Sequence, residues 1–317
     1  MNTLTTIAAN PEASLGLLGV PLAVLAGALR VSTPFLFVSL GECLTERSGR
    51  VNLGLEGTLV MGAMVGYGGS YLSGSPWLGV LGAAAVGAIL GALHAFLCAR
   101  PRVNDISVGI ALMLLGVGLA FFLGKPLVQP SAARLPSISL GFFSDSPQVR
   151  SALQVNALFL LGLVLAPTLR WALASTRWGL VLRTVGESAE AARAMGYDVA
   201  RVRLLATAAG GALAGVGGSF LSLFYPGSWN EGLSSGQGLM AVALVIFARW
   251  DPVRCLYASL LFGGASALGP ALQSVGVTQG YYLFNAAPYA LTLLIMILSS
   301  SATHASADSP AELTRVR

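Results

Sequence analysis

Long apolar segments are the feature of this sequence that most restricts its fold. Seven windows, each close to the ~20 apolar residues that a helix needs to cross a bilayer, cover residues 51–72, 77–97, 106–124, 155–174, 204–224, 255–275 and 281–299. In lipid, every backbone polar group must be bonded within the protein, which a helix achieves alone. The windows therefore predict an all-α polytopic membrane protein.

The charge content supports this prediction and excludes the main soluble classes. Only 10% of the residues are charged, against roughly 25% in soluble domains, and 55% are hydrophobic. A soluble surface needs far more ionisable side chains than this. A soluble enzyme, a nucleic-acid-binding protein and a disulfide-stapled domain are therefore set aside.

Two further segments are less regular than the seven windows. Residues 15–44 are apolar but contain Arg30 and Pro34, so they form either one long kinked helix or an interfacial piece followed by a span, and they are counted once. Residues 233–248 are short and rich in glycine, which predicts a broken or re-entrant helix. We thus expect about nine spans (8–10), with an N-terminal tail (1–14), a transmembrane domain (15–300) and a C-terminal cytoplasmic tail (301–317).

The distribution of basic residues predicts the orientation. With nine spans and an external N-terminus, only Arg30, Lys125, Arg134 and Arg150 lie outside. Fourteen arginines then lie on the cytoplasmic side, as the positive-inside rule requires: Arg47, Arg50, Arg100, Arg102, Arg170, Arg177, Arg183, Arg193, Arg201, Arg203, Arg249, Arg254, Arg315 and Arg317. Residues 125–154 form the external loop in this topology.

The internal loop, residues 175–204, has the punctuation of a cytoplasmic helical element. Gly186 and Glu187 form a turn, a short helix with Glu190, Ala191 and Ala192 follows, and Gly196 ends it. Small residues within a charged rim make a flat face suited to docking another protein. The alternative is a solvated connecting loop, although thirty residues exceed what a connection needs.

Several motifs resemble one family of transport proteins. Glu190-Ala191-Ala192 followed after three residues by Gly196 resembles the EAA-x-x-x-G element by which ABC importer permeases engage their ATPase, without its usual Leu-Pro end. Residues 41–57, GECLTERSGRVNLGLEG, resemble the signature of the nucleoside and simple-sugar branch of these permeases. That branch is related to the branched-chain amino-acid and ribose permeases. Further matches at 104–106, 177–187 and 236–252 extend the resemblance over roughly residues 30–300.

The resemblance implies a permease subunit in the bacterial inner membrane that carries nucleosides or related purine-type molecules, with no catalytic residues. Its implied partners are a cytoplasmic ABC ATPase, a second permease, an external binding protein or lipoprotein, and the lipid bilayer. The ATPase would dock at a coupling helix through six residues: Gly186, Glu187, Glu190, Ala191, Ala192 and Gly196.

The sequence contains no motif that would bind a nucleotide or a metal cofactor. No G-x-x-x-x-G-K-[ST] phosphate cradle occurs, so any ATP that drives transport binds another subunit. The two histidines, His94 and His304, are far apart in the sequence and predict no metal centre. We therefore expect no cofactor in this chain.

Glu56 is the single residue with the most open role. An acid this deep in a span must pair or meet water, and Asn52, one helical turn earlier, would share its face. Glu56 either lines the pore or forms a structural pair with Arg47 or Arg50. A second interpretation makes Glu42, Glu46 and Arg50 a row of interfacial ion pairs.

A polar and aromatic group lies at the predicted external mouth. Trp229, Asn230 and Gln237 could stack on and hydrogen-bond a base or sugar, or Trp229 could belong to an interfacial aromatic belt. The alternatives left open for the whole protein are an ABC permease for simple sugars or branched-chain amino acids, and an ion-coupled carrier that would use Glu56.

Overall fold

The computed structural model describes residues 19–140, 153–274, 283–284, 286–299 and 309–314. Its elements are α1 (Gly19–Arg47), α2 (Leu55–Ser73), α3 (Pro76–Cys98), α4 (Asp105–Gly124), η2 (Lys125–Leu127), β1 (Ser137–Ser139), β2 (Gln154–Asn156), α6 (Ala157–Ser175), α7 (Arg177–Glu187), α8 (Ala189–Ala194), α9 (Val199–Leu223), α10 (Gln237–Phe247), α11 (Pro252–Ser274), α13 (Ala287–Ser299) and α14 (Ala311–Thr314). The fold is a helical bundle, and its two described strands form one small antiparallel hairpin.

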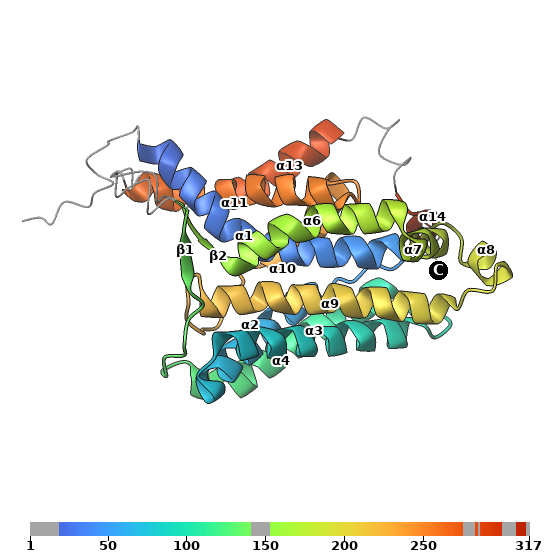
Figure 1. Cartoon of the computed structure of the whole chain (residues 1–317), viewed down its shortest axis with the longest axis horizontal. Helices are drawn as coiled ribbons and strands as arrows, with labels where there is room; N and C mark the ends of the chain where they lie inside the picture. Colours follow the sequence, from blue (N-terminus) through green and yellow to red (C-terminus); the bar gives the residue numbers. More distant parts are fainter. Residues whose placement is uncertain (1–18, 141–152, 275–282, 285, 300–308, 315–317) are drawn as a thin grey trace, which may run out of the picture.

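The long helices run side by side along the longest axis of the molecule, so the bundle has two ends (Figure 1). At one end lie α7, α8 and α14, and hydrogen bonds there join arginines to distant backbone: Arg47 Nε to the Trp250 carbonyl (3.1 Å) and Arg203 Nε to that of Ser48 (3.0 Å). We call it the basic end. The β1–β2 hairpin, in which Ile138 pairs with Val155, lies at the opposite end of the bundle, which we call the strand end.

Six helices of the described chain are long and apolar enough to cross a membrane: Val20–Arg47, Pro76–Cys98, Asp105–Leu127, Ala157–Ser175, Val199–Leu223 and Pro252–Gln273. The chain is thus an all-α, multi-pass membrane protein, but the predicted count of nine is not confirmed. Three predicted spans fall short. The window 233–248 contains the 11-residue helix α10. In the window 281–299, the longest helix among the described residues is the 13-residue α13.

The third predicted span that is not among the six, the window 51–72, is explained by helix packing. Its helix, α2, has 19 residues, 14 of them buried, and its mean hydropathy is lowered by glycine, serine and Glu56. A helix surrounded by other helices does not face lipid, so it needs less hydrophobicity than one at the periphery. α4 shows the opposite case, since only five of its 20 residues are buried.

The irregular N-terminal segment forms one helix. α1 runs without a break from Gly19 to Arg47, with Pro34 inside it, so the prediction of a single span from 15–44 is confirmed for the described part. The predicted tail, residues 1–14, lies outside the described residues, as do 141–152 of the predicted external loop.

Glycines let α2, α3 and α9 pack backbone to backbone. A Cβ at Gly87 of α3 would lie 2.1 Å from the carbonyl oxygen of Gly211 on α9, and one at Gly62 of α2 would lie 2.5 Å from that of Gly215. Gly91 similarly faces the carbonyl of Thr207. Gly62 and Gly66, Gly87 and Gly91, and Gly211 and Gly215 are each four residues apart, a small-xxx-small spacing typical of helices that associate through close packing.

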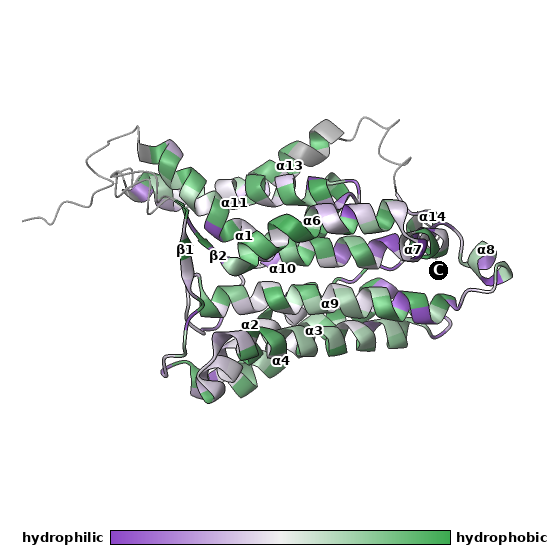
Figure 2. Cartoon of the chain, in the orientation of Figure 1, coloured by the Kyte–Doolittle hydropathy of each residue, from purple (hydrophilic) through white to green (hydrophobic). Residues whose placement is uncertain are grey.

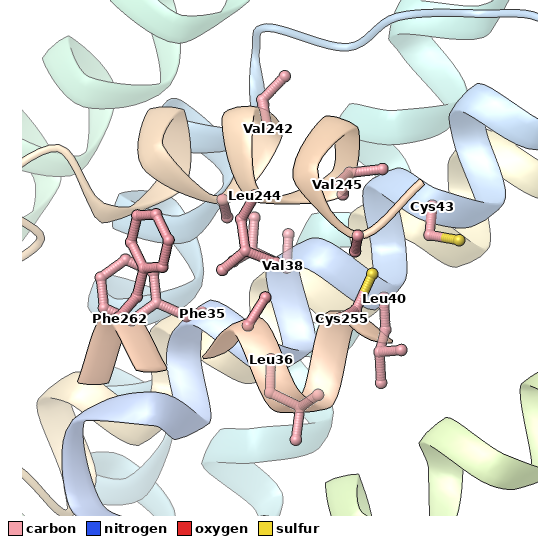
Figure 3. Packing of buried hydrophobic residues seen from close by; sticks show 14 of the residues in the cluster. Phe35, Leu36, Val38, Leu40, Cys43, Val242, Leu244, Val245, Cys255 and Phe262 are labelled. Carbon is pink, nitrogen blue, oxygen red and sulfur yellow. The ribbon is translucent and has the colours of Figure 1, made fainter. Parts of the chain in front are cut away.

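A hydrophobic core joins α1, α10 and α11. Phe35 and Val38 of α1, Leu244 of α10, and Cys255 and Phe262 of α11 converge there (Figure 3). Apolar residues cover the long helices, whereas polar ones gather on α7, on α8 and at the adjoining ends of α1 and α9 (Figure 2). This distribution is that of a membrane bundle with one polar, charged end.

Candidate functional site

The segment that connects α9 to α10 leads from the strand end back into the bundle. α9 ends at Leu223, and Trp229 then donates its indole N–H to the carbonyl of Gly124, the last residue of α4 (2.9 Å). From this strand-end position, residues 230–236 lead to α10, which ends beside the basic end, where the Trp250 carbonyl accepts from Cys43 and Arg47. With 11 residues, α10 is about 16 Å long at 1.5 Å per residue, about half the ~30 Å hydrocarbon thickness. Its N-terminus therefore lies about halfway along the bundle, where Gly236 and Gln237 are half-buried.

Glu56 binds this buried helix N-terminus. Its carboxylate accepts hydrogen bonds from Ser234 Oγ (2.5 Å) and from the backbone N–H groups of Gly236 (3.2 Å) and Gly238 (2.7 Å). Glu56 itself stands in the first turn of α2, so a single carboxylate lies at the N-termini of two helices. Unbonded N–H groups and the helix dipole make such ends favourable for a negative charge.

The suggested pairing of Glu56 with Arg47 or Arg50 is wrong. Arg47 donates to the Trp250 carbonyl, and Arg50 donates to Asp105 Oδ1 and to the Cys98 carbonyl. Both arginines are engaged at the basic end, whereas Glu56 reaches toward the middle of the bundle. Glu56 belongs to α2, whereas Arg47 ends α1 and Arg50 lies between the two helices, so spacing within one helix could not relate them.

Gln237 is the predicted pathway residue that the structure places beside Glu56. It is the first residue of α10, between the two glycines whose N–H groups bind Glu56, and it is half-buried. Its Oε1 is buried and has no hydrogen-bond partner among the described residues. Together, Glu56, Ser234 and Gln237 form a polar group inside the bundle, and we call it the inner polar group.

The other predicted pathway residues lie elsewhere. Asn52 precedes α2, so it shares no helix face with Glu56; its N–H donates to Glu42 and its Oδ1 accepts from Gly54. Trp229 is buried, 2% exposed, and its N–H is already bonded, so it packs the strand end rather than lining an open mouth. Asn230 is exposed near that end.

The expected row of ion pairs at Glu42, Glu46 and Arg50 is also wrong. Glu42 accepts the Asn52 N–H, Glu46 accepts the indole N–H of Trp250, and Arg50 pairs with Asp105. Each side chain thus fastens the end of α1 to a different segment. Only Glu42 and Glu46 lie on α1, since the helix ends at Arg47, so the i, i+4 spacing does not apply to Arg50, and it predicted none of the three partners.

The predicted coupling loop forms two helices at the basic end. The turn expected at Gly186 and Glu187 is wrong, because both residues lie in the last turn of α7 and the break falls at Ser188. The Ser188 hydroxyl caps α8 by accepting the Ala191 N–H (3.2 Å), and the chain leaves α8 through Gly196 at φ 85°. The prediction that Gly196 ends this helix is confirmed. α8 lies at the far tip of the basic end, beyond the long helices (Figure 1).

The six predicted docking residues divide into two groups. Glu187, Glu190, Ala191 and Gly196 are exposed, whereas Gly186 and Ala192 are buried. Gly186 is a packing residue, since a Cβ there would lie 2.2 Å from the Arg47 carbonyl oxygen. The backbone of α7 therefore rests directly on the end of α1, and the exposed face belongs to α8.

The C-terminal segment 309–314 also belongs to this end, which sequence reasoning missed. The Glu312 carboxylate accepts from Arg203 (3.1 Å) and from the Ala189 N–H that begins α8 (3.2 Å), and both side chains are at most 5% exposed. The Ala311 N–H in turn donates to Glu187 (3.4 Å). One acid in a polar tail gives no periodic signal, so this contact was not predictable from the sequence.

Comparison with known proteins gives a consistent family. The sequence model of the family described as "Branched-chain amino acid transport system / permease component" matches residues 24–300. The nucleoside ABC transporter permease protein of Lactococcus lactis is 30% identical over 87% of this chain and 91% of its own length, and the guanosine ABC transporter permease protein of Bacillus subtilis is 30% identical over 84% and 88%. A Haloferax volcanii protein named putative glucose ABC transporter permease protein is 37% identical over 78% of this chain and 77% of its own.

Proposed function

We propose a function from one premise: this chain belongs to the family of branched-chain amino acid transport system permease components. Members of such a family are transporter subunits rather than enzymes. We infer that this chain is the membrane-spanning permease of an ABC importer in the bacterial inner membrane, with ATP hydrolysis on a separate subunit. The observation that carries this proposal is α8, a capped and exposed helix at the tip of the basic end.

The proposed orientation puts the basic end in the cytoplasm. The positive-inside rule supports it, because arginines from several connections meet at this end. A cytoplasmic ABC ATPase would then contact Glu190 and Ala191 on α8, together with Glu187 at the end of α7 and Gly196 just after α8, all of which are exposed. A second permease, identical or paralogous, would complete the pore, and an external binding protein or lipoprotein would deliver substrate at the strand end.

The proposed mechanism is a switch between two rigid arrangements. Closure of the ATPase pair on ATP binding would bring the docked α8 helices together, and the bundle would follow because α7 packs tightly on α1 at Gly186. α8 is further tied to α9 and to the C-terminal segment through Glu312. These contacts would hold the short helix α8 rigidly, so that movement of the ATPase is transmitted to the bundle.

Nucleosides or related purine-type molecules are the proposed substrates, supported by the names of two relatives and by the inner polar group. The partnerless Oε1 of Gln237 is an acceptor held deep in the bundle, where an N–H or O–H of a base or ribose would satisfy it. Simple sugars are the second candidate, since one relative is named for glucose. Branched-chain amino acids and an ion-coupled carrier remain weaker alternatives.

Uptake into vesicles tests the class and the substrate together. Vesicles carrying this chain with the products of its neighbouring genes should accumulate radiolabelled guanosine and adenosine, in preference to ribose and leucine, only when ATP is inside. ATP-dependent uptake of ribose or leucine alone would keep the importer and overturn the substrate. Gradient-driven uptake by this chain alone would overturn the importer.

Gly196→Glu should abolish uptake while leaving the amount of inserted protein unchanged. Gly196 follows α8, is exposed and has φ 85°, so glutamate would strain the turn and add a charged side chain at the docking face. ATP-driven uptake and co-purification of the ATPase are the two measurements.

Gly74→Glu is the matched control, because Gly74 has φ 70°, is exposed, and likewise has no atom within 4 Å of its Cβ position. It lies in the α2–α3 turn, away from α8. Equal loss of uptake in both variants would attribute the effect to backbone strain and would reject the docking assignment.

A further inference from the structure

Five arginines from three separate parts of the chain line one small cavity at the basic end. Its volume is about 160 Å³, and its walls come from the end of α3, the 99–104 turn, α8, α9 and the segment after α1. The five are Arg50, Arg100, Arg102, Arg193 and Arg203. A water molecule takes up about 30 Å³ in the liquid, so this space is large enough for one tetrahedral anion.

The charge in this cavity is not balanced by the described residues. Asp105 pairs with Arg50 and Glu312 pairs with Arg203, and no carboxylate lines the cavity itself. Arg100, Arg102 and Arg193 form no ion pair in the described part of the chain, although the Arg100 guanidinium stacks 5.3 Å from the centre of the Phe96 ring. Convergent guanidinium groups repel one another unless an anion lies between them.

A buried donor gives a second and independent observation. The Arg50 side chain is 5% exposed, and while its two terminal nitrogens bind Asp105 and Cys98, its Nε is buried without a hydrogen-bond partner among the described residues. An unsatisfied buried donor costs free energy, so such a group usually has a partner in the working protein. Arg50 lines the cavity, where an anion could accept from it.

Membrane topology alone does not account for this arrangement. The positive-inside rule is satisfied by arginines that point into water anywhere on the cytoplasmic side, as exposed Arg254 does. It does not require five arginines to line one cavity. Basic pockets between helices on the cytoplasmic side are, in contrast, typical sites for phosphate-bearing head groups.

We propose that this cavity binds a phosphate group, with guanidinium groups of the five arginines as its ligands. Arginine suits this role because its planar donors match the oxygens of phosphate. The group could be inorganic or metabolite phosphate from the cytoplasm, or the phosphodiester of an anionic lipid. Because α8 and α9 both supply ligands, the bound anion would tie the proposed coupling helix to the 99–104 turn.

Calorimetric titration of the full chain in phosphatidylcholine nanodiscs tests the proposal without any transport step. One arm titrates inorganic phosphate and the other a short-chain phosphatidylglycerol. The variants are Arg102→Gln and Arg100→Gln/Arg102→Gln, since both residues are exposed. Arg177→Gln/Arg254→Gln removes two exposed arginines outside the cavity and is the control matched in charge.

We expect saturable binding by the wild-type chain and the control, and affinity lower by about tenfold or more in the double variant, equivalent to about 1.4 kcal/mol. Binding in only one arm supports the site and identifies its source as soluble or lipid. No saturable binding by the wild type, or equal affinity in the double variant and the control, overturns the proposal. Uptake plays no part in this measurement, so its result is separate from the fate of the proposed function.

Discussion

Replacing Gly87 with valine should prevent the bundle from assembling. A Cβ at this position would lie 2.1 Å from the Gly211 carbonyl oxygen and 3.1 Å from the Gly215 Cα, so α3 and α9 would have to separate. Both obstacles are backbone atoms of a buried helix, which cannot move aside as a side chain can. The cost of such overpacking is about 3 kcal/mol or more, and we expect little monodisperse protein after detergent extraction and size-exclusion chromatography.

Gly118→Val is the matched control for this experiment. Gly118 lies within α4, is exposed, and has no atom within 4 Å of its Cβ position, so valine there meets only lipid. Both variants make the same change of helix propensity. A Gly87→Val protein as abundant and as thermally stable as Gly118→Val would show that the α3–α9 contact is not as close as described.

Glu56→Gln should reduce ATP-driven uptake to below about a tenth while protein remains in the membrane. The carboxylate accepts three hydrogen bonds from the segment that begins α10, and an amide would turn an N–H group toward donors. Losing a charged acceptor at a buried helix N-terminus costs about 2 kcal/mol. We expect α10 to lose its fixed position, and with it Gln237. Uptake normalised to the amount of inserted protein is the measurement.

Ser234→Ala separates anchoring by the backbone from anchoring by the hydroxyl. It removes one of the three donors and leaves the Gly236 and Gly238 N–H groups on Glu56, so most of the uptake should remain. Equal loss in both variants would contradict the helix-anchoring role of Glu56. A wild-type activity that needed an ion gradient and no ATPase, and that Glu56→Gln abolished, would favour the ion-coupled carrier instead.

Helical segments and their ends were largely predictable because the signals are local. The windows 77–97, 106–124, 155–174 and 204–224 each correspond closely to α3, α4, α6 and α9. Gly196 ended α8 as expected, because positive φ favours glycine wherever it occurs. The short, glycine-rich window 233–248 predicted a broken or re-entrant helix, and the structure forms there the continuous but short helix α10.

Partners of charged residues were not predictable, because they come from parts of the chain far apart in sequence. Glu56 binds residues 234–238, Glu46 binds Trp250, and Glu312 binds Arg203. Spacing rules address only neighbours within one helix, and they suggested the nearby Arg47 and Arg50 instead. The inner polar group and the arginine-lined cavity both depend on such distant contacts.

The sequence by itself determined that this chain is a helical membrane protein, where most of its spans lie, and which family it resembles, because hydrophobic length and short motifs are properties of contiguous residues. Tertiary structure decided that α2 is buried, that α10 begins inside the bundle on the Glu56 carboxylate, and that five arginines share one cavity. The physical reason is that burial and ion pairing depend on which helices meet. Here glycines at Gly62, Gly87 and Gly211 permit that meeting, but only the packed bundle selects the partners.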